Sequence, residues 1–190
     1  MTTRLTNLGV AWTAQFLVTT AGTPEQLSAK RRAATIAFSE NTPESDTITD
    51  SGNGFLIAGF QAGDQITITS TSALNNGTYV IASVVAGTIT LLMRNDLTTE
   101  TAAAAGTVKI TAPKSVPDGV AVTLKAMYAN GGTIRIADSS EKALNTGTGG
   151  FGLRNNESVG LQVENISDIW LDATVSGEGV EVIFEKSVQA

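Results

Sequence analysis

The stretch ESVGLQVEN, residues 157–165, decides the fold class of this chain. Val159, Leu161 and Val163 alternate there with glycine, glutamine and glutamate. A β-strand turns successive side chains to opposite faces, so a period of two predicts a strand with one buried face.

Directly upstream, the stretch NTGTGGFGLRNN, residues 145–156, places Gly147, Gly149 and Gly152 at the spacing G-x-G-x-x-G. This spacing is the dinucleotide-binding fingerprint, which requires a buried strand before the first glycine and a helix starting at the last one. The preceding SSEKALNTG is polar and short, and a strand pattern follows. We therefore interpret the glycines as a flexible connection between β-strands.

The same pattern of short apolar alternations separated by turns extends along the chain. Its 19 glycines, its recurrent threonine and valine, and its weak helical periodicity predict an all-β protein. Asn76-Gly77 predicts a type I′ hairpin turn. Strands are expected at residues 15–19, 47–49, 65–69, 78–85, 88–93, 107–111, 121–126, 133–137, 158–164, 168–174 and 179–185.

Three segments are harder to assign from local pattern. Residues 24–34 and 100–105 are compatible with short helices or with extended chain. The apolar FLIAGF, residues 55–60, is expected to plug one end of a small barrel, with Phe55, Leu56 and Phe60 in the core. Trp170 alternates with apolar neighbours and is expected in the core.

The order of the strand patterns predicts a domain insertion. AQFLVTTAGTPEQLS (residues 14–28) and SVPDGVAVTLKAMYANGGTIRIADSS (residues 115–140) read as consecutive strands of one domain. We expect a β-sandwich formed by residues 1–33 and 114–190, with a small antiparallel β-barrel, residues 34–113, inserted between them. Such an insertion is tolerated where entry and exit points are close. The alternative is two domains in series with an N-terminal arm.

Composition excludes several classes of site. Without cysteine or histidine there is no disulfide, no thiolate metal site, no Ser-His-Asp arrangement and no ordinary zinc site. The net charge of −6 argues against nucleic acid as a partner. The basic run Lys30, Arg31 and Arg32 is interpreted as a solvated turn, and the acidic clusters, including residues 40–46 and 138–141, as solvated strand ends. No apolar run predicts a membrane span or an export signal.

Two sets of motifs resemble modules of tailed-bacteriophage virion proteins. In the outer segments these are the A-G-T turn at residues 21–23, the P-D-G turn at residues 117–119 before VAVTLKA, the Gly-Phe loop before E-S-V, and S-G-E at residues 176–178. In the inserted segment they are G-F-x-x-G-D, N-N-G-T-Y and I-A-S-V. The resemblance implies a virion structural protein of the capsid decoration or head-fibre type.

From this resemblance we expect a non-enzymatic capsid decoration (cement) or head-fibre protein without cofactor or metal. It would be made in the host cytoplasm and would lie on the capsid surface of the virion. Its partners would be the phage major capsid protein and copies of itself, as a trimer where capsid symmetry favours one. The alternatives are a tail or baseplate component, or a carbohydrate-binding adhesin that uses the inserted domain; an enzyme would have to work with carboxylates, lysines or serines.

The N-terminal segment is the candidate contact surface. Residues 1–14 are expected to form an arm that packs on a capsid protein or on a neighbouring copy, with Leu5, Leu8, Val10 and Trp12 as apolar anchors. For Trp12 the alternative is that it caps the sandwich of its own chain.

Overall fold

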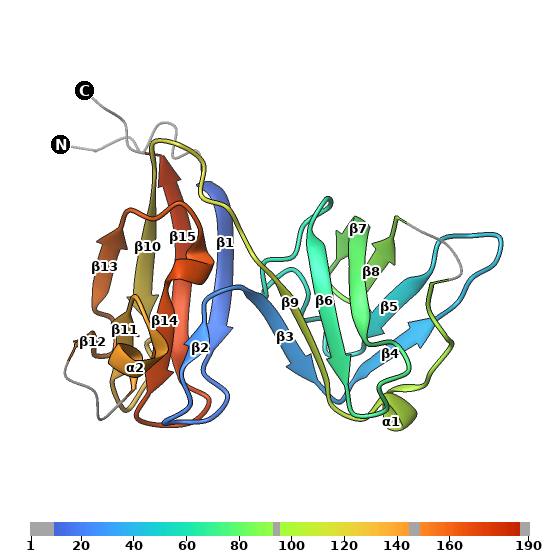
Figure 1. The fold of residues 1–190 in the computed structure, drawn as a ribbon, viewed down its shortest axis with the longest axis horizontal. Coiled ribbons are helices and arrows are strands. Elements are labelled where there is room, and N and C mark those ends of the chain that lie inside the picture. Colours follow the sequence, from blue (N-terminus) through green and yellow to red (C-terminus); the bar gives the residue numbers. More distant parts are fainter. Residues whose placement is uncertain (1–9, 93–95, 145–148, 187–190) are drawn as a thin grey trace. The chain divides into compact units, whose positions relative to one another are not determined.

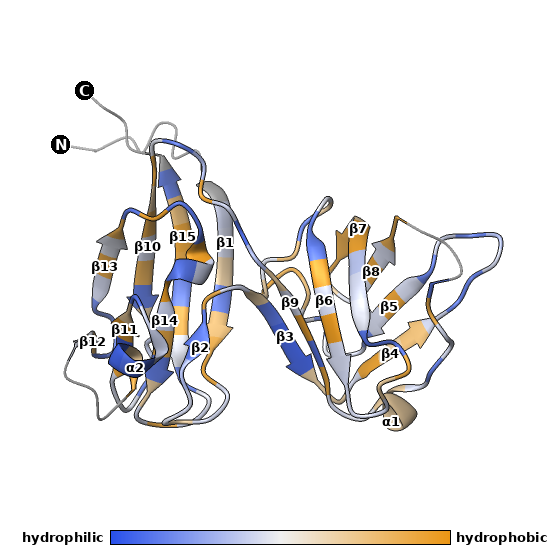
Figure 2. Cartoon of the chain, in the orientation of Figure 1, coloured by the Kyte–Doolittle hydropathy of each residue, from blue (hydrophilic) through white to orange (hydrophobic). Residues whose placement is uncertain are grey.

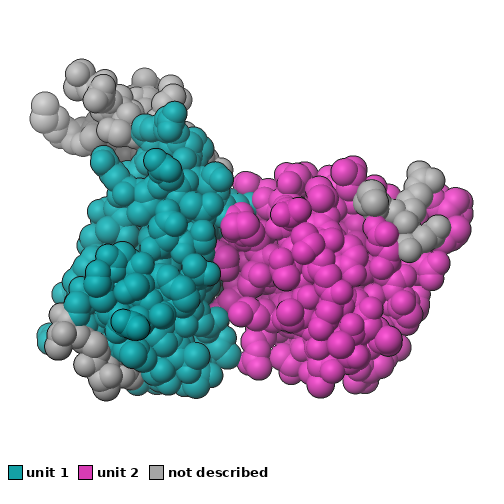
Figure 3. Space-filling view, in the orientation of Figure 1, with its two compact units in different colours: residues 1–27, 114–190 teal, residues 28–113 magenta. Residues whose placement is uncertain are grey.

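The computed structural model describes residues 10–92, 96–144 and 149–186, and this part of the chain is predominantly β. It divides into two compact units, residues 1–27 with 114–190 (unit 1) and residues 28–113 (unit 2) (Figure 3). The division falls at Ser28, earlier than the boundary at residue 34 expected from sequence.

Unit 1 contains two antiparallel four-stranded sheets (Figure 1). A short α-helix, α2 (Ser140–Ala143), follows strand β11 (Ile134–Ala137), and a 3₁₀ turn, η1 (Ile166–Asp168), precedes strand β14 (Trp170–Ala173). The first sheet has the order β1 (Val10–Leu17), β15 (Gly179–Lys186), β10 (Val120–Ala126), β13 (Ser158–Leu161). The second has the order β12 (Phe151–Leu153), β11 (Ile134–Ala137), β14 (Trp170–Ala173), β2 (Glu25–Gln26).

Unit 2 contains one antiparallel seven-stranded sheet and the α-helix α1 (Ala102–Ala105), which is capped by the Thr101 hydroxyl. The strand order is β3 (Ala29–Ala33), β9 (Val108–Ala112), β6 (Gln65–Ser70), β7 (Gly77–Val85), β8 (Thr88–Leu91), β5 (Thr47–Asp50), β4 (Ile36–Ser39). The pairing does not close this sheet into a barrel. The outer edge of β4 instead meets residue 100, because the backbone groups of Phe38 and Glu100 bond each other in both directions at 2.9 Å.

The cores follow the period of two that the sequence shows. In β6, Ile66 and Ile68 are buried while the threonines between and after them are exposed, and the hydropathy colouring alternates along this strand (Figure 2). In β10, Val122, Leu124 and Ala126 are buried in the same way. Since burial of alternate apolar side chains drives sheet packing, these two strands form where the sequence alternates.

The two junctions between the units lie close together within each unit. In unit 2, Ala29 pairs with Ala112, so the first and last strands of the unit are neighbours. In unit 1, Leu27 donates to the Ile169 carbonyl at 2.9 Å, and the Lys114 carbonyl accepts from Ile166 at 3.0 Å. The residues that flank the inserted unit therefore both contact the segment around η1.

Several local expectations are wrong in detail. The basic run lies in strand β3 rather than in a turn, since β3 pairs with β9 over five positions. Leu56 is 51% exposed, because residues 54–58 form a helical turn that directs only some side chains inward. Neither Asn76 nor Gly77 has a positive φ; the bend uses Ala73 (φ 63°) in a six-residue connection. Phe55 and Phe60 are buried, as expected, whereas Trp170 is only half-buried.

Candidate functional site

The structure describes only some of the N-terminal apolar residues that the sequence suggested as anchors. Leu5 and Leu8 lie outside the described residues, and of Val10 only the backbone is described, at the start of β1. A separate arm would therefore end before Val10, because β1 is paired with β15 from that residue on.

Trp12 packs inside unit 1. Its side chain is 4% exposed, its ring centroid lies 4.9 Å from that of Phe184, and Lys114 Nζ lies 5.7 Å from the ring. A buried aromatic ring beneath an ammonium group gains both packing and cation–π attraction. Trp12 accordingly has little surface to offer to a partner, and its environment is that of the capping alternative.

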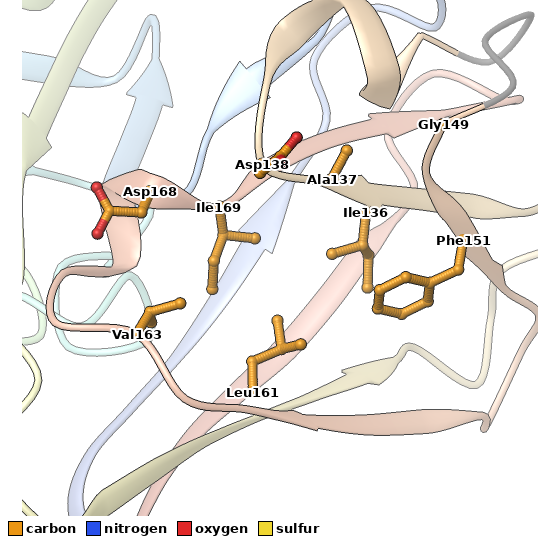
Figure 4. A pocket seen from close by; sticks show the side chains of 9 residues that line it. All are labelled: Ile136, Ala137, Asp138, Gly149, Phe151, Leu161, Val163, Asp168 and Ile169. Atoms are coloured by element: carbon orange, nitrogen blue, oxygen red, sulfur yellow. The ribbon is translucent and has the colours of Figure 1, made fainter.

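One concave surface of unit 1 is a groove of about 280 Å³ (the edge groove). It lies between strands of the two sheets, and the Phe151 ring points into it (Figure 4). Its lining is mainly apolar, with carboxylates only at one side. The lining residues are Ile136, Ala137, Asp138, Gly149, Phe151, Leu161, Val163, Asp168 and Ile169.

Two short strands of the described chain border the groove. Strand β12 has three residues and pairs only with β11 among the described strands, and β13 has four residues and pairs only with β10. Neither strand covers the apolar side chains between the two sheets, and Phe151 remains 44% exposed. Each also has one backbone edge without a strand partner in the described chain, and such an edge can accept a further strand.

The side chains at the rim of the groove carry a small negative excess. Asp138 and Asp168 are exposed, and Lys142 Nζ donates to Asp138 Oδ2 at 2.8 Å. The hydrogen bond from Lys142 lowers the pKa of Asp138. Two carboxylates and one ammonium group leave one net negative charge beside an apolar surface.

The glycine motif borders this groove and does not form a nucleotide site. Gly147 lies outside the described residues, Gly149 lines the groove, and Gly152 lies within β12. A strand therefore follows where the fingerprint needs a helix. Gly150 is required for close approach rather than for unusual φ, since a Cβ there would meet the carbonyl oxygens of Ile136 and Lys142 at 2.7 and 2.9 Å.

No group of three or more acidic side chains in the described chain is arranged to hold a metal ion. The buried carboxylates of Asp46 and Glu178 instead accept hydrogen bonds from backbone amides. Asp46 accepts from the amides of Asn41, Asp96 and Leu97 at 2.8–3.0 Å, and Glu178 Oε1 accepts from Gly131 and Gly132. Such carboxylates order loops.

The aromatic side chains of unit 2 provide no exposed platform for a sugar ring. Phe38, Phe55 and Phe60 are at most 1% exposed, and the half-buried Tyr79 donates to the Asn75 carbonyl at 3.1 Å. These are all the aromatic residues of residues 28–113. The glycan-binding alternative, which depended on this unit, receives no support from its aromatic residues.

Sequence reasoning did not single out the edge groove. The period of two identifies Leu161 and Val163 as positions on an apolar face, but it does not reveal that the strands beside them are too short to cover that face. None of the helices in the described chain is long and apolar enough to cross a bilayer.

Comparison with protein-family models, with curated proteins and with solved structures gives no match to this chain. The edge groove, its two flanking strands and the sequence motifs are therefore the basis for a functional proposal.

Proposed function

We propose that this chain is a non-enzymatic structural protein of a tailed-phage virion, a capsid decoration or head-fibre protein bound to the outside of the major capsid shell. The observation that carries the proposal is the edge groove of unit 1. It offers apolar side chains and two strand edges together, which suits contact with a polypeptide.

The chemistry of the groove favours a protein partner over a small molecule. Small-molecule sites combine an apolar lining with a few polar groups that converge on the ligand. Here the polar side chains, Asp138 and Asp168, lie at the rim and are solvent-exposed, and Asp138 already pairs with Lys142. A strand edge with adjacent apolar positions instead supplies main-chain hydrogen bonds and side-chain pockets for an extended segment.

We infer that the two four-stranded sheets of unit 1 pack face to face as a β-sandwich, and that the seven-stranded sheet of unit 2 curves into an open, barrel-like fold. The buried faces of β10 and β15, with Val122, Leu124, Val182 and Phe184, support the sandwich. The motifs that resemble virion modules lie in these two units.

The proposed function would depend on many copies of the protein bound to one shell. A decoration protein bridges neighbouring capsid subunits, and many weak contacts over a closed shell give a stable coat without a strong single contact. Capsid three-fold positions would favour a trimer. A tail or baseplate location would use the same contacts in another part of the particle.

The test is made on particles of a phage whose genome encodes this chain, with and without the gene. We expect cryo-electron microscopy to show added density on the outer shell, and mass spectrometry to give a fixed ratio of this chain to the capsid protein. Purified protein added back should restore the density and raise the temperature at which shells rupture. Recovery of the chain only with tails would favour the tail alternative, and its absence from particles would overturn the proposal.

A further inference from the structure

The edge groove lacks a cover in the described chain, and the segment that precedes β1 has the chemistry to supply one. We propose that residues 1–9 of a second copy of this chain lie extended in the edge groove of unit 1, with leucine side chains in the apolar lining and Arg4 at the acidic rim. The proposal rests on the proposed function, since a virion shell places copies side by side.

The composition of the segment matches the groove. MTTRLTNLG contains Leu5, Leu8 and Arg4 and no acidic residue. The groove offers the exposed ring of Phe151 and an apolar lining, with Asp138 and Asp168 at its rim. Apolar side chains would leave water while the guanidinium stays at the solvent edge, where it interacts favourably with the carboxylates.

The backbone of the groove also suits an extended occupant. Strands β12 and β13 are the outermost described strands of their sheets on this side. Phe151 and Leu153 belong to one of these edges and Ser158 to Leu161 to the other. An added strand can bond either edge through its main chain and place alternate side chains in the groove.

The position of Val10 favours a second copy over the chain's own segment. Val10 pairs with Glu185, Glu185 pairs with Ala121, and the neighbouring Val122 pairs with Leu161. The segment therefore starts on the far edge strand, β1, at the level of the groove but about 14 Å from β13, three strand spacings away.

Nine extended residues span about 30 Å. The crossing to its own groove would use about half of that length, which includes Leu8. A neighbouring copy can place both Leu5 and Leu8, and reciprocal exchange between two copies or around a ring would satisfy each groove once.

The experiment uses the purified full chain alone, so its result does not depend on any virion. Molar mass is measured by size-exclusion chromatography with light scattering over a concentration series. We expect association of the wild-type chain, and a shift of its midpoint to at least tenfold higher concentration for Phe151→Asp and for Arg4→Glu. Val175→Asp, a comparably exposed position of unit 1 away from the groove, is the matched control and should associate like the wild type.

Two further measurements separate the proposal from a general loss of stability. A mixture of Phe151→Asp, which has an intact segment, and Leu5→Asp, which has an intact groove, should associate at a concentration at which neither variant alone does. A synthetic peptide of residues 1–10 should dissociate wild-type oligomers, whereas a scrambled peptide should not. Circular dichroism melting curves recorded below the association midpoint should be nearly unchanged, because Phe151 is already 44% exposed.

A wild-type chain that stays monomeric at every concentration would overturn the proposal, as would association that Phe151→Asp leaves unchanged. A chain that associates through this groove but is absent from particles would support the docking and overturn the virion role. The two failures are therefore distinguishable.

Discussion

The Nε of Arg31 donates a 2.7 Å hydrogen bond to Oδ2 of Asp50, whose side chain is completely buried. The same carboxylate accepts from the Thr35 hydroxyl and from the amides of Gly52 and Gly54. Arg31 lies in β3 and Asp50 ends β5, so this one acid connects two strands of unit 2 with the loop that leads to the buried phenylalanines.

Removal of the arginine should destabilise unit 2. Arg31→Ala leaves a buried carboxylate without its cationic partner, and we expect a loss of about 1–3 kcal/mol, less than for a fully buried pair because Arg31 is 27% exposed. Urea unfolding monitored by circular dichroism measures it. The control is Arg32→Ala in the same strand, which is exposed and should change stability by less than about 0.5 kcal/mol. Equal effects of the two substitutions would contradict the assigned role of Asp50.

The same carboxylate gives unit 2 a defined pH dependence. Burial raises the pKa of Asp50, but the hydrogen bonds from Arg31, Thr35, Gly52 and Gly54 outweigh it and lower the pKa from 3.8 to about 2. Because the folded-state pKa lies below the unfolded value, the stabilisation is complete above about pH 4 and is lost as the pH falls toward 2. It amounts to about 2 kcal/mol.

Unfolding free energies measured between pH 5 and pH 2 check this dependence. Asp50→Asn should flatten the slope below pH 4 by more than Asp138→Asn does, because Asp138 is exposed and its pKa is lowered chiefly by one exposed hydrogen bond from Lys142. A wild-type slope that survives in Asp50→Asn would assign the acid sensitivity to another carboxylate.

Because the backbone packs closely around Gly179, a side chain at this position should lower the stability of unit 1. A Cβ on Gly179 would overlap the Phe16 carbonyl oxygen and contact the Leu17 backbone, so Gly179→Ala must displace β1 from β15. We expect a loss of about 3 kcal/mol or more. Gly160→Ala in β13 is the control, since a Cβ at that position would have no neighbouring atom within 4 Å, and it should be neutral or slightly stabilising. Denaturant unfolding of the two variants compares them directly.

The strand patterns could be predicted from the sequence because they depend on local alternation. Ile66 and Ile68 or Val122 and Leu124 show the period of two that determines which face is buried. Residues 29–33 could not be assigned in this way. Their helix-forming composition is overridden by pairing with β9, a strand some eighty positions away in sequence. Local pattern carries no information on such a partner.

The candidate site was less predictable than the fold. The alternating sequence identifies Leu161 and Val163 as positions on an apolar face. Whether other strands cover these side chains depends on the lengths of β12 and β13 and on the order of strands in the two sheets. Trp12 illustrates the converse. It lies in a weakly patterned segment that suggested a surface arm, but the ladder between β1 and β15 places its ring against Phe184.

Truncation of Trp12 should therefore act on folding. Trp12→Ala removes the contact with Phe184 and the cation–π contact with Lys114, and we expect unit 1 to lose about 3–5 kcal/mol. Phe151→Ala, which truncates a half-exposed ring at the groove, should cost less than about 1 kcal/mol. Thermal unfolding followed by circular dichroism distinguishes the two. A Trp12→Ala chain with wild-type stability would contradict the packing described for β1.

The inserted unit should fold without the rest of the chain. Its first and last strands, β3 and β9, are paired neighbours, and its core is formed by its own residues, including Phe38, Phe55 and Phe60. A polypeptide of residues 28–113 should therefore show β-type circular dichroism and a cooperative urea transition. The matched control is residues 34–113, the shorter segment suggested by sequence. It lacks β3 and the Arg31 partner of Asp50. It should therefore unfold at a lower urea concentration, with a free energy of unfolding smaller by several kcal/mol, or remain unfolded. Equal stability of the two polypeptides would show that β3 is dispensable and would move the boundary of the unit back to residue 34.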